Sequence, residues 1–249
     1  MPKIVAIIAA RMGSERLPGK HMHDIGGKPM IEHLIDRVRQ SQKIDGIVVA
    51  IPEGAENDVL AQLCKEKNIS CHRGPEDDVV ARMIGALEQE KADIGVQVYG
   101  DGPLIDPAVI DELIGIYRQD DSYDLIGNDM KASYPSGCYA EVFAVQTLKE
   151  AAERTQDPAV REHGTLCMRQ HPEIYKIMNI EAQGNLHRPD IHLDVDTEED
   201  ARVIEAIVDN FAPRNNFSLH EMLAFLDENP DIMKLNKNVF RRWKQYQRK

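Results

Sequence analysis

The sequence has little cysteine and no long apolar run. Its cysteines, Cys64, Cys71, Cys138 and Cys167, follow no zinc-binding spacing, which predicts reduced, mostly buried thiols rather than disulfides or a metal site. No segment approaches the roughly 18 apolar residues that span a bilayer. Met-Pro-Lys leads directly into a predicted apolar strand, so we expect no signal peptide. We therefore expect a cytoplasmic protein that does not contact membranes.

An excess of positive charge is also absent. The 30 Lys and Arg against 42 Asp and Glu give a net charge of −12, which argues against general binding to nucleic acid. One stretch departs from this balance, because residues 232–249 contain no Asp or Glu. Its basic residues are Lys234, Lys237, Arg241, Arg242, Lys244, Arg248 and Lys249. This basic tail is either a contact for an acidic surface or a solvated helix end.

The first half of the sequence alternates apolar runs with helix-like segments. Strands are predicted over 3–9, 46–51, 70–72 and 94–99, and helices over 30–40, 55–67, 77–90 and 107–118, the last with Asp106 as its cap. Strands and helices that alternate with short connections form right-handed crossovers and a largely parallel sheet. We expect an α/β fold with a mostly parallel central sheet and helices on both faces.

The second half is less regular. Strands are predicted over 139–145, 173–180 and 190–195, and helices over 147–154, 198–210 and 219–226, the last with Ser218 as N-cap and Glu221 three residues on. The polar segment 127–140 is a possible arm or acceptor lobe. We expect a main domain over residues 1–212 and a helical extension with the basic tail over 213–249.

The segment "AARMGSERLPGK", residues 9–20, follows the first predicted strand and places three basic residues in a glycine-hinged loop. Ligands of parallel sheets bind at the carboxyl ends of the strands, and phosphates require close backbone N–H groups and fixed cations. Gly13 and Gly19 permit such an approach, and Arg11, Arg16 and Lys20 supply the charge. The Walker and dinucleotide-binding patterns do not fit. The loop is either a phosphate-binding loop of another type or a basic surface turn.

These residues, with several later motifs, carry a family resemblance. The loop and the following "GGKPM" resemble the opening of the cytidylyltransferases that make CMP-activated sugar acids, such as the CMP-Kdo and CMP-sialic acid synthetases. The likeness is greatest to the spore-coat polysaccharide biosynthesis F-type branch. It continues in order through "EDDVVARM", "GDGPLIDP", "REH" and "DVDTEEDARVI", over about the first 210 residues. The resemblance implies a nucleotide-diphospho-sugar transferase fold, similar to the GT-A fold, and a homodimer.

Acidic residues at two strand ends are candidate metal ligands. Asp101 follows the strand at 94–99, although a single aspartate in this position is often a helix cap. If residues 190–195 are extended, Asp194 and Asp196 share one face, and two such charges require a cation or a shared proton. Asp196 is alternatively the cap of the next helix. The resemblance implies that Asp101, Asp194 and Asp196 bind catalytic Mg²⁺.

The resemblance also implies roles for other side chains. Those near the nucleotide are Ala9, Ala10, Arg11, Gly13, Ser14, Lys20, Lys28, Arg73, Arg82 and Asp101, and those near the acceptor are Glu141, Arg161 and His163. Arg73 and Arg82 are alternatively surface arginines, and His163 is alternatively a helix-end residue. Gly102 stands where family members often carry a larger residue, which suggests extra space beside the acceptor.

The function that the resemblance implies is transfer of CMP from CTP to a sugar acid, with release of pyrophosphate. Arg11, Arg16, Lys20 and Asp101 are the expected catalytic residues, and Mg²⁺ is the expected cofactor. Two alternatives stay open. The first is a glycosyltransferase that uses a nucleotide sugar, since the Asp194–Asp196 motif also suits a metal beneath a diphosphate. The second is a non-catalytic nucleotide-binding protein.

Overall fold

The computed structural model describes residues 1–120 and 122–241. Within these residues one sheet has seven strands, in the order β5-β4-β1-β6-β8-β7-β9. Its strands in chain order are β1 (Ile4–Ala9), β4 (Gly46–Pro52), β5 (Ser70–Gly74), β6 (Ile94–Val98), β7 (Leu125–Gly127), β8 (Ala140–Ala144) and β9 (Ile177–Asn179). Only β8 is antiparallel to its neighbours within this part of the chain. The predicted mostly parallel sheet is confirmed.

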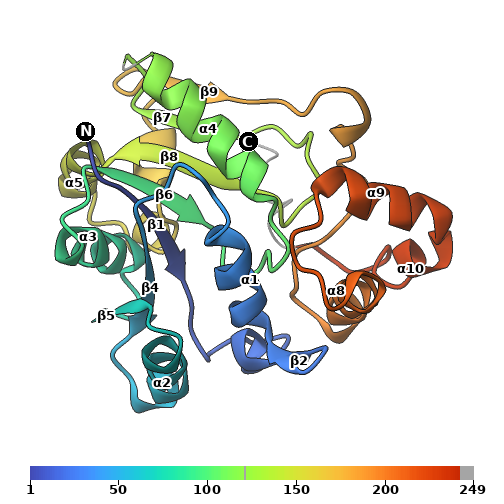
Figure 1. The fold of residues 1–249 in the computed structure, drawn as a ribbon. Helices are drawn as coiled ribbons and strands as arrows, with labels where there is room; N and C mark the ends of the chain where they lie inside the picture. Colours follow the sequence, from blue (N-terminus) through green and yellow to red (C-terminus); the bar gives the residue numbers. More distant parts are fainter. Residues whose placement is uncertain (121, 242–249) are drawn as a thin grey trace.

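A two-stranded antiparallel hairpin and a set of helices complete the fold (Figure 1). The hairpin strands are β2 (Asp24–Ile25) and β3 (Lys28–Pro29). The α-helices are α1 (Met30–Val38), α2 (Asp58–Glu66), α3 (Val79–Gln89), α4 (Pro107–Gln119), α5 (Val145–Glu153), α6 (Pro158–Arg161), α7 (Leu166–Arg169), α8 (Glu198–Phe211), α9 (Leu219–Glu228) and α10 (Pro230–Lys234). Short 3-10 turns are η1 (Lys20–Met22), η2 (Ala55–Asn57) and η3 (Gly184–Leu186).

The two faces of the sheet bury separate hydrophobic cores. In β1, successive side chains point to opposite faces, so Ile4 and Ile8 enter one core while Val5 and Ile7 enter the other. Helices α1, α2, α4, α8 and α9 cover the first core, and α3, α5 and α7 cover the second. The predicted arrangement of helices on both faces is therefore confirmed. The predicted division of the chain at residue 212 stays a prediction.

The second half differs from the pattern predicted for it. Residues 190–195 form no strand of the sheet, and His192 forms an isolated β-bridge with Ser136. The main-chain N–H groups of this segment donate to separate places, because Ile191 donates to the Arg188 carbonyl, Leu193 to the Ser136 carbonyl and Val195 to the Asp101 carbonyl. The segment therefore connects two loops instead of extending the sheet. The predicted strand over 173–180 is also reduced to β9, and β7 was not predicted.

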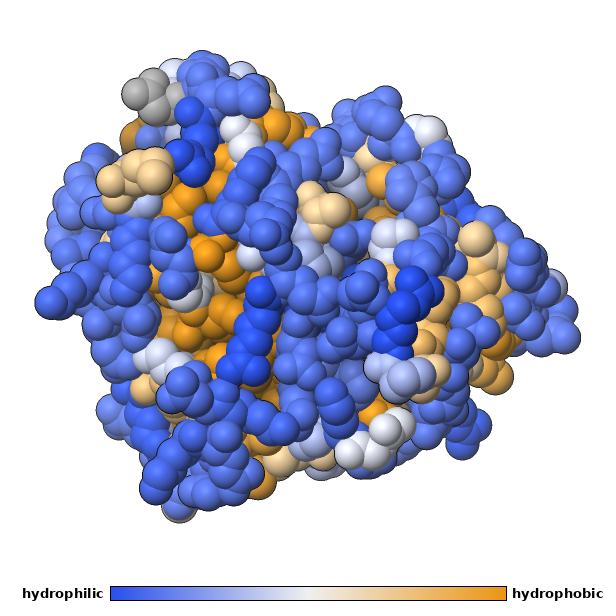
Figure 2. Space-filling view, viewed as in Figure 1, coloured by the Kyte–Doolittle hydropathy of each residue, from blue (hydrophilic) through white to orange (hydrophobic). Residues whose placement is uncertain are grey.

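The fold brings several connecting segments to the carboxyl ends of β1, β4 and β6. Figure 1 shows α8, α9 and α10 packed together on the side of the molecule near α1. The face seen in Figure 2 is mainly hydrophilic, with hydrophobic residues visible over the central sheet and again on the right, beside α9 and α10. Among the residues that the structure describes, no helix combines the length and the apolar character needed to cross a membrane.

Candidate functional site

The loop over residues 9–20 is closed by its own main chain at the end of β1. The Ala10 N–H donates to the Ala50 carbonyl, and the N–H groups of Ser14 and Gly19 both donate to the Met12 carbonyl. Gly19 has a φ of 70°, in the left-handed region that favours glycine, immediately before η1. The turn directs Lys20 back towards the sheet edge.

Lys20 lies between the loop and two acidic segments. Its Nζ atom is 2.9 Å from Asp196 Oδ1 and 3.9 Å from Asp101 Oδ2, and it donates to the Val195 carbonyl at 3.0 Å. Arg16 Nη2 lies 2.5 Å from Asp196 Oδ2. The structure thus brings together two predicted cations and two predicted carboxylates from three distant parts of the chain.

The two carboxylates have different electrostatic environments. Burial, followed by the nearby charges of Asp196 and Asp194, raises the pKa of Asp101 to about 6, although Lys20 opposes this. The side chain of Asp101 is still 36% exposed, so the surrounding protein raises the pKa without enclosing the carboxyl completely. Burial would also raise the pKa of Asp196, but Lys20 and Arg16 hold it below its ordinary value.

Asp194 is placed differently from the other two predicted ligands. Ser136 Oγ donates a short hydrogen bond to its Oδ1, and Arg241 Nη1 lies 3.5 Å from its Oδ2. Both carboxylate oxygens of this buried residue are therefore directed at protein groups. The alternative that Asp196 caps α8 is wrong, because Thr197 is the N-cap and forms a capping box with Asp200.

The donor set at this edge suits a hard divalent cation. Among residues 1–120 and 122–241, no group of three or more His, Cys, Asp or Glu side chains is arranged to hold a metal. Mg²⁺ does not require such a group, because proteins usually bind it through one or two carboxylates together with phosphate oxygens and water. Asp101 and Asp196 meet that requirement, since both reach the same ammonium group.

The expectation of extra space at Gly102 is wrong. A Cβ atom at this position would lie 2.2 Å from the Gly137 carbonyl oxygen. Gly137 has a φ of +84°, and its own Cβ would lie 2.6 Å from the main-chain nitrogen of Asp194. Three main-chain segments therefore pack against one another directly, and glycine is needed for this contact rather than for an enlarged acceptor pocket.

Alanine at position 102 should destabilise the protein. We expect a loss of about 1–3 kcal/mol of unfolding free energy, because the added methyl group forces the Gly137 main chain to move. Urea denaturation of Gly102→Ala measures the loss. Gly13→Ala is the control, since its Cβ would meet its nearest atom only at 3.8 Å. Equal stability of the two variants would show that the contact does not constrain the fold.

Other predicted loop residues surround this centre. Ala9 and Ala10 end β1, and Gly13 and Ser14 form the outer part of the loop. Arg11 Nη2 is 4.0 Å from Glu162 Oε1, and the Arg11 side chain is 43% exposed. Beneath the loop, burial lowers the pKa of His21 to about 3, so its neutral ring donates from Nδ1 to the Arg11 carbonyl. The predictions for these residues stay predictions.

Three predicted nucleotide-binding residues make other contacts. Lys28 pairs with Asp36 on α1 at 3.0 Å, and Arg73 pairs with Asp58 at 2.5 Å. Arg82 is buried, and its guanidinium donates to the carbonyls of Pro75 and Glu76. The structure does not bring these three side chains to Lys20, and their nucleotide contacts stay predictions.

The predicted acceptor residues are divided between two places. Arg161 donates to Asp78 Oδ2 at 2.8 Å and to two main-chain carbonyls, and His163 is exposed. Glu141 is completely buried in β8, where Thr165 Oγ1 and Arg169 donate to it. Burial raises the pKa of Glu141, and the guanidinium of Arg169 opposes this.

Glu141 belongs to a polar cluster that sequence reasoning missed. The cluster, named the Arg169 cluster here, consists of Tyr99, Asp129, Glu141, Thr165 and Arg169. Arg169 Nη2 donates to both Asp129 oxygens at 2.6 and 2.7 Å, and the Tyr99 hydroxyl donates to Asp129 and Glu141. Tyr99 precedes Asp101 by two residues, so the cluster begins beside the predicted metal site. No local pattern connects residues as far apart as 99 and 169, so the sequence carries no signal for it.

Comparison with known proteins identifies the family. The family model for cytidylyltransferases matches residues 5–241. The chain belongs to the cytidylyltransferase family. The match includes the loop at 9–20, both acidic segments and the chain as far as Arg241.

Some similar proteins match this chain over nearly its whole length, and others match less than half of it. The chain is 32% identical over 237 residues to the spore coat polysaccharide biosynthesis protein SpsF of Bacillus subtilis, covering 93% of this chain and 97% of that protein. It is 40% identical over 113 residues to the 3-deoxy-manno-octulosonate cytidylyltransferase of Trichlorobacter lovleyi, covering 45% of this chain and 44% of that protein. A solved cytidylyltransferase structure from Leptospira borgpetersenii has a TM-score of 0.90 at 24% identity, covering 97% of this chain and 100% of the other. The predicted family and nucleotide-diphospho-sugar transferase fold are confirmed.

Proposed function

We propose that this cytidylyltransferase transfers CMP from CTP to a sugar acid and releases pyrophosphate, in the synthesis of a surface polysaccharide precursor. The observation that carries the proposal is the position of Lys20, whose ammonium group lies within 4 Å of Asp101 and Asp196. A triphosphate with a divalent cation needs this combination of cations and carboxylates at one place. The similarity to SpsF and to a 3-deoxy-manno-octulosonate cytidylyltransferase supports a sugar acid as acceptor.

The proposed reaction is an in-line displacement at the α-phosphorus of CTP. A sugar hydroxyl oxygen forms a bond to this phosphorus and loses its proton, while the bond to the oxygen that bridges the α- and β-phosphates breaks. Pyrophosphate leaves with that oxygen and its electron pair. The protein contributes chiefly by positioning the two substrates and by placing positive charge where the leaving group gains negative charge.

The residues have separate roles in this proposal. Arg16 and Lys20 bind the β- and γ-phosphates, and Arg11 and the main chain at Gly13 and Ser14 complete the loop. Asp101 and Asp196 would hold Mg²⁺, which would neutralise phosphate oxygens. Arg16 and Lys20 both pair with Asp196, so a triphosphate would compete with that carboxylate for these cations.

The acceptor is proposed to bind beside Asp101, towards the Arg169 cluster. Tyr99 leads from β6 into this region, and the side chain of Arg169 is 22% exposed. Residues 127–140 also pass there, with Ser133, Tyr134 and Ser136 buried against the protein. We propose that residues 127–140 form an acceptor lobe. The proposal also includes a cytoplasmic location and a homodimer.

Product analysis tests the proposed function. The four nucleoside triphosphates are each incubated with Mg²⁺ and a panel of sugar acids, and pyrophosphate and the nucleotide-sugar product are measured. We expect pyrophosphate with CTP and a CMP-sugar in equal amounts. Release of a nucleoside diphosphate from a nucleotide sugar would instead support glycosyl transfer. Binding of CTP without turnover on any acceptor would support a non-catalytic role. Neither of these outcomes agrees with the proposal.

A further inference from the structure

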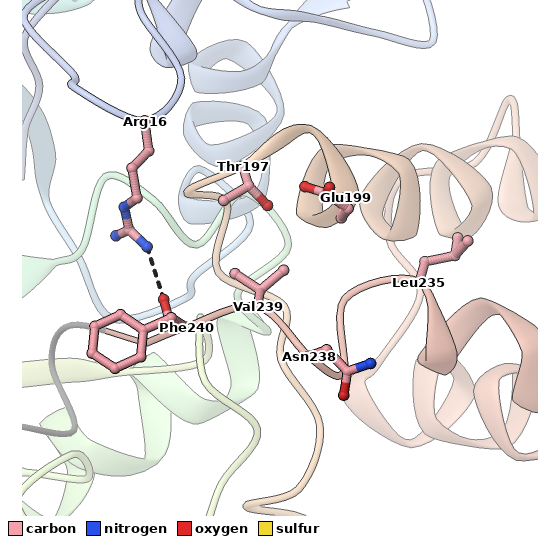
Figure 3. Close-up of a pocket in the computed structure, with 7 residues that line it drawn as sticks. All are labelled: Arg16, Thr197, Glu199, Leu235, Asn238, Val239 and Phe240. Carbon is pink, nitrogen blue, oxygen red and sulfur yellow. Dashed lines mark hydrogen bonds between the residues drawn. The ribbon is translucent and has the colours of Figure 1, made fainter.

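The segment that follows α10, residues 235–241, bends and turns beside the loop at 9–20 and is called the C-terminal strap here. Figure 3 shows Arg16 pointing from the loop towards the strap, where its Nη1 donates to the Phe240 carbonyl at 3.1 Å. Thr197 and Glu199, at the start of α8, line the same pocket as Leu235, Asn238 and Val239 of the strap. The strap therefore forms one wall of the space beside Arg16.

Two buried side chains attach the strap to Asp200. Arg241 Nη2 donates to Asp200 Oδ1 at 2.6 Å, and Asn236 Nδ2 donates to the same oxygen at 2.9 Å. Asn236 Nδ2 also donates to the His192 carbonyl at 3.0 Å. Arg241 and Asn236 are only 2% and 3% exposed, so these contacts are formed away from water.

The other oxygen of Asp200 holds the main chain that carries Asp196. Asp200 Oδ2 accepts from the Asp196 N–H at 3.1 Å and from the Thr197 N–H at 3.0 Å. One buried carboxylate thus connects the strap to the main chain of a candidate metal ligand. Because Arg241 Nη1 also lies 3.5 Å from Asp194 Oδ2, its guanidinium contacts both carboxylates that flank this ligand.

The burial of Arg241 carries a desolvation cost that its hydrogen bonds offset only in part. Within residues 1–120 and 122–241, its Nε and Nη1 atoms are buried without a hydrogen-bond partner. Unpaired buried donors are unfavourable, so the burial of this guanidinium depends on its charged partners. Its two ion pairs are with Asp194 and Asp200, and its position is therefore suited to holding the segment 194–200.

We propose that Arg241 is a positioning residue for the divalent-cation site and that Asp194 is its anchor rather than a cation ligand. Arg241 acts through Asp200 on Asp196, and the cation is held by Asp196 and Asp101. This inference rests on the proposed function. Without the guanidinium, Asp194 and Asp200 lose their shared counter-charge, and the main chain at Asp196 loses its support. Mutation of a group that orients a metal ligand in this way commonly lowers metal affinity or activity by roughly 10- to 100-fold.

The test measures CTP binding by isothermal titration calorimetry at a series of Mg²⁺ concentrations. At each Mg²⁺ concentration the titration gives an association constant for CTP. For Arg241→Met we expect the Mg²⁺ concentration at which this constant reaches half of its maximum to rise roughly 10-fold or more. Arg241→Lys keeps the charge but cannot contact Asp194 and Asp200 together, so an intermediate value is expected. If Arg241→Met does not fold, the Mg²⁺ requirement of Arg241→Lys still tests the proposal.

Two controls separate positioning from charge and from stability. Lys237→Met removes an exposed positive charge from the same strap and should bind as the wild type does. Arg37→Met removes a buried arginine that donates to the carbonyls of Ile105, Asn215 and Phe217, so it should lower the melting temperature without changing the Mg²⁺ requirement.

The outcomes distinguish this inference from the proposed function. If the wild type does not bind CTP at any Mg²⁺ concentration, the proposed function fails. If the wild type binds and both folded Arg241 variants show the wild-type Mg²⁺ requirement, the inference fails while the proposed function stands. If Arg241→Met requires more Mg²⁺ than the wild type while Lys237→Met and Arg37→Met do not, the result supports the inference.

Discussion

Pyrophosphate release from CTP is expected to fall about 100- to 1000-fold in Lys20→Ala, which corresponds to a loss of about 3–4 kcal/mol of transition-state stabilisation. In the proposed reaction this ammonium group faces the leaving pyrophosphate, where negative charge develops. Its removal also takes a cation away from Asp101 and leaves Asp196 paired with Arg16 alone, so the repulsion between these carboxylates and the triphosphate increases. The measurement is kcat and KM for pyrophosphate release at saturating Mg²⁺.

A matched lysine controls for the general effect of removing a charge. Lys43 precedes β4, at the edge of the sheet opposite the loops, and its Nζ donates to the Asp111 carbonyl at 2.7 Å. Lys43→Ala should therefore keep the wild-type kcat. If Lys20→Ala and Lys43→Ala release pyrophosphate at similar, near-normal rates, the loop does not bind the reacting phosphates, and the role proposed for Lys20 is wrong.

Arg169→Met is expected to destabilise the protein by about 3–5 kcal/mol, because the change leaves two carboxylates without their shared cation. Glu141 is completely buried, and the side chain of Asp129 is only 13% exposed. The remaining donors, Tyr99 and Thr165, can hydrogen-bond to these oxygens but cannot neutralise their charge. Urea denaturation at pH 7 measures the free energy of unfolding.

The pH dependence of this loss identifies its cause. Burial raises the pKa of Glu141 and Arg169 opposes it, so the pKa should rise further in Arg169→Met. Between the lower pKa of the unfolded state and this higher value, the folded protein binds more protons than the unfolded chain, and its stability increases as the pH falls. The loss in Arg169→Met relative to the wild type should therefore become smaller as the pH is lowered from 7 towards 5.

Two further variants make the comparison specific. Glu141→Gln combined with Arg169→Met should recover part of the loss, since the buried negative charge is removed together with its partner. Arg214→Met breaks an exposed pair with Glu221 and should cost less than about 1 kcal/mol. A loss in Arg169→Met as small as that in Arg214→Met would show that the Arg169 cluster does not stabilise the fold.

Local patterns predicted the elements whose signals lie within a few residues. Asp106 caps α4 through the Ala108 N–H, and Ser218 with Glu221 forms the capping box of α9, as their spacing indicated. These predictions succeeded because a cap contacts main-chain groups two or three residues away. The strand predicted over 190–195 is wrong, because a strand requires a continuous partner and the residues of this segment do not show which segments lie beside it. In the structure its N–H groups donate to the separate carbonyls of Arg188, Ser136 and Asp101.

The basic tail illustrates the limit of reading charge along the chain. The charge pattern of residues 232–249 predicts either a contact with an acidic surface, of a partner or of this protein, or a solvated helix end, and it does not decide between them. In the structure Arg241 is buried against Asp194 and Asp200 of this protein. Residues 242–249 lie outside the described part of the chain, so the prediction for them stays a prediction. Burial of a charge depends on the carboxylates that surround it in space, and the sequence places those carboxylates some forty positions earlier.

The sequence by itself determined the alternation of strands and helices, the parallel part of the sheet, the basic loop and the family. All of these depend on residue types at short, regular spacing. Only the tertiary structure decided which carboxylates face Lys20, why Gly102 must be glycine, and where Glu141, Arg169 and Arg241 lie. The physical reason is that each of these depends on contacts between segments far apart in the chain, where distance, burial and counter-charge decide what a side chain can do.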